Sequence, residues 1–98
     1  MTARPDEFYL IKGSDRLATY RFNTGVAEHH FCKSCGIYTH HRCRSNPSEL
    51  GVNVACLAGL SPFDFAEVRV NDGQLHPSDR TDGRRDVIAG WLRYTCAP

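Results

Sequence analysis

The residues best suited to chemistry are two cysteines, Cys32 and Cys35, in the stretch FCKSCG. A Cys-x-x-Cys turn can bring two thiolates to one zinc ion, about 2.3 Å from each, while backbone amides of the turn point at the sulfurs. Gly36 follows the second cysteine and permits the left-handed conformation that often closes such a turn. The alternative is a pair of buried structural thiols, but the spacing and the glycine favour zinc. We therefore predict that Cys32 and Cys35 bind zinc as half of a structural site.

A structural zinc needs four ligands, and the sequence leaves the other two open. The candidates are the remaining cysteines and four histidines: Cys43, Cys56, Cys96, His29, His30, His40 and His41. The histidines form two adjacent pairs in expected strands, so the two rings of each pair should face opposite sides of a sheet. A single histidine is more often exposed or hydrogen bonded than a ligand. We expect Cys56, in an apolar run, to be a small core residue and Cys96 to be an exposed thiol.

Cysteine-based catalysis is a weaker interpretation of the same residues. A thioredoxin-like oxidoreductase would need its Cys-x-x-Cys at the start of a helix, whereas the residues that follow, GIYTH at 36–40, are typical of a strand. A cysteine protease could also place a cysteine beside a histidine, but no further pattern supports it. The sequence assigns no catalytic residue.

Composition limits the class of protein and of partner. Ninety-eight residues, 41% of them hydrophobic, predict a single domain with a core of marginal stability. A formal charge of +1 predicts neither nucleic acid nor membrane as a partner, and Arg80, Arg84 and Arg85 alternate with aspartates as in a solvated loop. No apolar run approaches the roughly 20 residues of a membrane span, and no signal peptide is evident. Five cysteines, an odd number, in an expected cytoplasmic protein favour metal over disulfides.

Short β-type runs separated by turn residues predict a mainly β fold of several short antiparallel strands. We expect strands over residues 8–11, 17–22, 52–57 and 86–95, with Tyr20 and Phe22 facing inward. Residues 68–70 should turn at Asp72-Gly73 and pair with 74–76 in a hairpin. Ser61 and Pro62 should begin a single helical turn over 61–64.

The order of these motifs resembles the glutathione-dependent formaldehyde-activating enzymes, a family that includes centromere protein V. The matching motifs are FYLIKG at 8–13, LATYRF at 17–22, HFCKSCG at 30–36, RSNP at 44–47, GVNVACL at 51–57 and DGQLHP at 72–77. A series of motifs in this order is far more specific than Cys-x-x-Cys alone, and it extends from about Phe8 to near the end of the chain.

The resemblance implies a small zinc-binding β domain over residues 1–98 and a carbon–sulfur lyase that joins glutathione and formaldehyde. Such domains open with a Cys-x-Cys that shares a structural zinc with the later Cys-x-x-Cys, and a further cysteine cluster holds a catalytic zinc. The first cysteine here is Cys32, so the amino-terminal half of the family pattern is missing. We therefore expect impaired activity toward glutathione or another small thiol adduct, and self-association through an uncovered sheet edge. The alternative is a non-catalytic, zinc-stabilised binding module.

Overall fold

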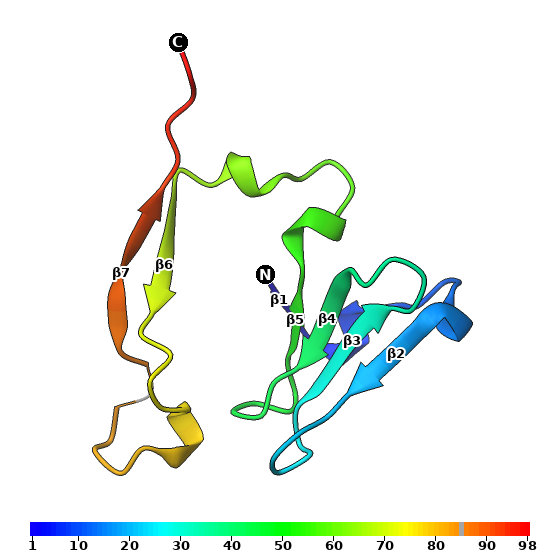
Figure 1. Cartoon of the computed structure of the whole chain (residues 1–98), viewed down its shortest axis with the longest axis horizontal. Helices are drawn as coiled ribbons and strands as arrows, with labels where there is room; N and C mark the ends of the chain where they lie inside the picture. The colour runs from blue at the N-terminus through cyan, green and yellow to red at the C-terminus, as the bar shows by residue number, and fades with distance from the viewer. Residues whose placement is uncertain (85) are drawn as a thin grey trace. The chain divides into compact units, whose positions relative to one another are not determined.

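The computed structural model describes residues 1–84 and 86–98, so Arg85 of the expected basic loop lies outside the described part. Seven strands occur in the described residues, all paired antiparallel, and the helices are single 3-10 turns (Figure 1). The predicted mainly β class is therefore confirmed. The chain divides into two compact units, Met1–Ala58 and Gly59–Pro98. None of the described helices has the length and apolar composition that crossing a bilayer would require.

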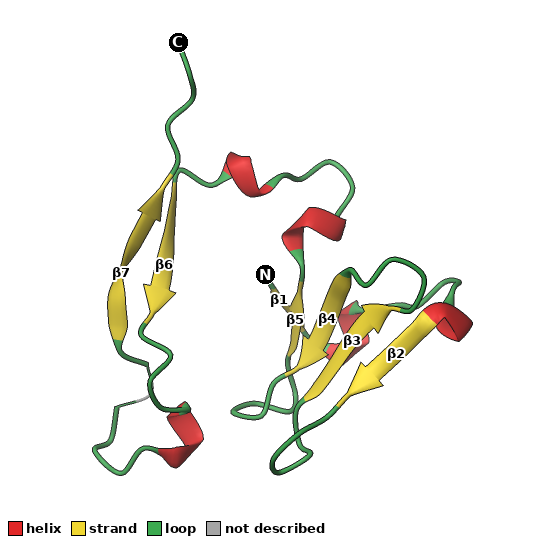
Figure 2. Ribbon diagram, viewed as in Figure 1, coloured by secondary structure: helices red, strands yellow, loops and turns green. Residues whose placement is uncertain are grey.

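The first unit contains a five-stranded sheet with the strand order β1-β5-β4-β3-β2 (Figure 2). Its strands are β1 (Thr2–Ala3), β2 (Leu17–Tyr20), β3 (Glu28–Cys32), β4 (Tyr38–Arg42) and β5 (Leu50–Val52). The turns η1 (Pro5–Glu7), η2 (Ser14–Arg16) and η3 (Val54–Cys56) complete the unit. The hairpin of β3 and β4 lies at the centre of the sheet, so it sets the position of most candidate site residues.

The register of this hairpin gives the sheet two different faces. His30 pairs with His40 and His29 pairs with His41 across the two strands, and consecutive strand residues point to opposite faces. One face, here called the aromatic face, carries the rings of Tyr20, Phe22, His29, Phe31, Tyr38 and His41. The opposite face carries Glu28, His30, His40 and Arg42 and is called the charged face.

Two expectations for the first half of the chain are wrong. Residues 8–11 form no strand; Phe8 instead packs on the His40 ring, with 4.6 Å between ring centroids. Strand β2 ends at Tyr20, and neither Tyr20 nor Phe22 is buried, since they are 58% and 56% exposed. Their rings stack on each other over the aromatic face, which no other element of this unit covers.

The strand expected over 52–57 is also mostly wrong. Strand β5 ends at Val52, and the chain turns into η3. Asn53 causes this turn, because its side chain accepts a hydrogen bond from the Ala55 amide at 3.1 Å and donates one to the Tyr38 carbonyl at 2.8 Å. Cys56 is exposed at the end of the turn rather than in a core, whereas Cys96 is exposed as predicted.

The second unit is a two-stranded hairpin with two 3-10 turns. The expected helical turn is confirmed as η4 (Pro62–Asp64), where Ser61 Oγ accepts from the Phe63 amide at 3.2 Å. Strand β6 (Glu67–Asn71) pairs with β7 (Ile88–Arg93), which confirms the strand expected in 86–95. The expected pairing of 68–70 with 74–76 is wrong, because the turn at Asp72-Gly73 leads into η5 (Pro77–Asp79) instead of a returning strand.

Neither unit has a closed apolar core. Among the described residues no apolar side chain is fully buried, and His40, at 8% exposed, is the one buried polar side chain. Burial of apolar surface is the main favourable contribution to folding. The described side chains therefore contribute little of this stabilisation by complete burial.

Candidate metal centre

Cys32 and Cys35 lie on the tight turn that joins β3 to β4. The Gly36 amide donates to the Cys32 carbonyl at 2.7 Å, and the Cys32 amide donates to the Ile37 carbonyl at 2.9 Å. Gly36 has a φ of 77°, which confirms the predicted left-handed conformation. The Lys33 amide also donates to the Arg16 carbonyl at 2.8 Å, so the turn is tied to the start of β2.

The turn directs backbone amides at the Cys32 sulfur. Hydrogen bonds from the backbone amide of Cys35 and then of Ser34 lower the pKa of the Cys32 thiol. These contacts favour the thiolate, which is the form that binds metal. Cys35 is exposed beside it. The local geometry thus offers two sulfurs, one of them already stabilised as an anion.

The other candidate ligands are dispersed over the hairpin, η3 and the residues after β7. The Cys56 sulfur, in η3, lies 3.9 Å from the Tyr38 carbonyl oxygen. Cys43 follows the far end of β4, so the five residues Tyr38–Arg42 separate it from the turn, roughly 15 Å at the rise of a strand. His29 and His41 lie on the aromatic face, at the same end as Cys43. Within residues 1–84 and 86–98 no three His, Cys, Asp or Glu side chains are arranged to hold one ion. The structure therefore brings Cys32 and Cys35 together on one turn, and their binding of zinc remains a prediction.

The histidines pair across the hairpin on opposite faces, as the adjacent-pair argument predicted. The rings of His30 and His40 stack with 4.4 Å between centroids, and those of His29 and His41 with 5.9 Å. Burial and the neighbouring His30 lower the pKa of His40, while burial and His29 lower the pKa of His41. The lowered pKa values favour the neutral form of the His40 and His41 rings.

A carboxylate on the charged face is fully engaged by cations. Glu28 accepts hydrogen bonds from Arg21 and, at 2.7 Å, from Arg42 Nη2, and His30 Nε2 lies 3.6 Å from its other oxygen. The hydrogen bond from Arg21 is the largest cause that lowers the pKa of Glu28. A carboxylate held ionised in this way stabilises the hairpin and is unsuited to act as a general acid.

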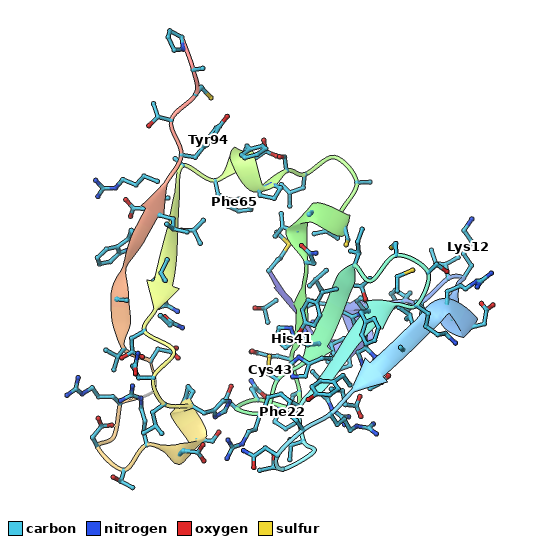
Figure 3. The ribbon with its side chains drawn as sticks, in the orientation of Figure 1. Lys12, Phe22, His41, Cys43, Phe65 and Tyr94 are labelled. Carbon is cyan, nitrogen blue, oxygen red and sulfur yellow. The ribbon has the colours of Figure 1, made fainter. Side chains whose placement is uncertain are left out.

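His41 and Cys43 make a contact on the aromatic face that was not predicted from the sequence. The Cys43 sulfur lies 3.5 Å from His41 Nε2, and Figure 3 shows the two side chains together near the end of β4. The signal was present, because residues i and i+2 of a strand point to the same face. Cys43 was considered only as a partner for the Cys32–Cys35 turn.

The aromatic face is hollowed beside these residues. Tyr20, Phe22, His29, Phe31 and Tyr38 line a shallow depression of about 410 Å³. Aromatic rings form most of this lining, and among its polar groups His29 Nδ1 lies 2.9 Å from the Tyr38 hydroxyl. It could accommodate a small apolar group against the rings.

No family model matches this chain. The structure is similar to that of a Rhodobacter sphaeroides protein determined as a structural genomics target, with a TM-score of 0.63 and 52% sequence identity over 64% of this chain. The match covers 58% of that protein, so the chain spans less than two thirds of its length. The description of that protein names no activity or ligand.

Proposed function

We propose that this chain is a zinc-binding β domain of the glutathione-dependent formaldehyde-activating type, acting in the cytoplasm. The observation that supports this most is the turn at Cys32 and Cys35, where two backbone amides point at one sulfur and Gly36 takes the left-handed conformation. This is the arrangement expected when a Cys-x-x-Cys turn binds zinc through both thiolates. The ordered motifs that resemble the family give the same assignment.

The proposed activity is that of a carbon–sulfur lyase on the adduct of glutathione and formaldehyde, at a low level. A Lewis-acid mechanism on such an adduct needs a zinc ion with an exchangeable position. Cys32 and Cys35 belong to the structural type of site, and the described residues contain no second cysteine cluster. A non-catalytic module stabilised by zinc is the alternative, and the open aromatic depression favours it as a surface for a small apolar group.

The test is to follow adduct formation from glutathione and formaldehyde by NMR, with and without protein. The enzymatic proposal expects a rate above the uncatalysed reaction that a chelator abolishes. A rate equal to the uncatalysed one, with zinc bound in the protein, would leave the binding module as the function. Cys32→Ser is the matched variant, and Cys56→Ser is its control because Cys56 is exposed and outside the turn.

A further inference from the structure

A second group of side chains of metal-binding type lies on the aromatic face. It is at the end of the β3–β4 hairpin that is far from the Cys32–Cys35 turn. The Cys43 sulfur and His41 Nε2 are 3.5 Å apart. A sulfur at about 2.3 Å and a nitrogen at about 2.0 Å from a tetrahedral zinc ion lie about 3.5 Å from each other. The pair already has the spacing that a shared ion would impose.

Gly51 of strand β5 shapes the environment of both side chains. It pairs with His41 across the sheet, and a Cβ atom at this position would lie 2.1 Å from His41 Cε1. Only glycine leaves room for the ring in its present place. The Gly51 amide also points at the Cys43 sulfur, as backbone amides do at metal-bound thiolates. Gly51 therefore leaves room for the His41 ring and directs its backbone amide at the Cys43 sulfur.

His29 supplies a third nitrogen next to this pair. Its ring stacks on that of His41, and its Nδ1 lies 2.9 Å from the Tyr38 hydroxyl. When the hydroxyl accepts the Nδ1 proton, Nε2 keeps its lone pair, which is the usual way that a neighbouring group prepares a histidine for a metal. His29 Nε2 is buried without a hydrogen-bond partner, a costly state that metal binding would relieve.

We propose that Cys43, His41 and His29 form a zinc site, separate from the Cys32–Cys35 turn, with one position open to a ligand from solution. Thiolate and imidazole ligands suit Zn²⁺. The Cys43–His41 pair is already in place. Because the described side chains as they stand do not converge in threes, binding turns the His29 ring toward the pair. Binding also releases the Cys43 proton to solvent, so affinity rises with pH.

The experiment is a zinc titration of the full chain followed by native mass spectrometry, with Co²⁺ absorption as a second readout. Cys43→Ser should bind one ion fewer per chain than Cys56→Ser, and its cobalt–thiolate band should be weaker. His41→Gln and His29→Gln should each lose affinity about 10-fold or more, because even the loss of an outer hydrogen bond to a ligand costs 10- to 100-fold. His40→Gln, on the charged face, should bind like the parent. Equal ion counts and affinities in Cys43→Ser and Cys56→Ser would overturn the proposal.

A measurement on the unaltered chain covers the case in which a variant does not fold. Zinc should shift the imidazole NMR signals of His29 and His41 while those of His30 and His40 stay in place, because the two pairs lie on opposite faces. Unchanged His29 and His41 signals at zinc saturation would exclude the site. Neither readout depends on lyase activity, so this site and the proposed function can fail separately.

Discussion

The thiols at the two ends of the central hairpin differ in their tendency to ionise. Backbone amides of Cys35 and Ser34 lower the pKa of Cys32, whereas burial and the nearby Glu49 raise the pKa of Cys43. Thiolates rather than thiols bind metal, so the surroundings of Cys32 favour the metal-binding form and those of Cys43 oppose it. Residue type alone could not distinguish them, because the difference comes from which backbone amides surround each sulfur.

Cys32→Ser should lower the zinc content of the freshly purified protein and remove much of its stability. A structural zinc contributes on the order of 10 kcal/mol to folding, and the described residues offer no closed apolar core to replace it. Elemental analysis together with thermal unfolding measures both effects, and Cys56→Ser is the control. Zinc-free but fully folded parent protein would show instead that Cys32 and Cys35 are structural thiols.

Acidification below pH 6.5 should destabilise the first unit through its paired histidines. Burial lowers the pKa of both His40 and His41 from the ordinary value of 6.5, so the unfolded chain binds protons more readily than the folded one. The free energy of unfolding is then fully retained above pH 6.5 and falls as the pH drops toward the lowered pKa values. Glu28 adds to the loss at lower pH, because its pKa is lowered from 4.5.

Urea unfolding at a series of pH values measures this dependence. His40→Gln should flatten the slope between pH 6.5 and 5 whatever it does to stability at pH 8. A parent protein equally stable at pH 8 and 5.5 would contradict the prediction.

The strands show what the sequence could predict at the level of elements. The histidine pairs on opposite faces, the left-handed Gly36 turn, the η4 turn and strand β7 follow local rules of alternation and capping, and all were predicted. Errors came where a tertiary contact decided the outcome. The Asn53 side chain bonds to the Tyr38 carbonyl and so ends β5, and β6 pairs with a strand 17 residues beyond its end instead of with its immediate successor.

Gly51→Ala should destabilise the first unit by about 1–3 kcal/mol, the usual cost of overpacking. The new Cβ would overlap the His41 ring, since its position is 2.1 Å from His41 Cε1. Gly90→Ala in β7 is the matched control, because a Cβ there meets no atom within 4 Å. Chemical denaturation compares the two variants, and equal midpoints would show that the ring moves aside without cost.

At the scale of the whole chain, we predict self-association from the open surfaces. Strand β2 is an edge of the five-stranded sheet, and the aromatic face beside it is exposed. An uncovered edge readily pairs with a second copy of itself. The proposed zinc site gives a second reason, because Cys32 and Cys35 would be two of the four ligands that a structural zinc needs. Two chains could hold one ion between them with four sulfurs.

Pairing through the β2 edge and linkage through a shared zinc ion predict dimers of different structure. Antiparallel pairing of two β2 strands would place the two Cys32–Cys35 turns at opposite ends of the joined sheet, because each turn lies at the β2 start. The two turns could not then share an ion. A zinc-linked dimer should therefore dissociate on chelation, whereas an edge-paired dimer should persist.

We expect the zinc-linked dimer, with one zinc ion per two chains at micromolar protein concentration. The zinc content is measured in the Cys43→Ser variant, so that the proposed second site does not contribute to it. Light scattering should show monomers after chelation and in Cys32→Ser. A proline at Thr19 of β2, whose amide faces the open edge, should leave this dimer intact but would break an edge-paired one. A stable monomer that holds one zinc per chain would exclude the shared site and require ligands from within the same chain.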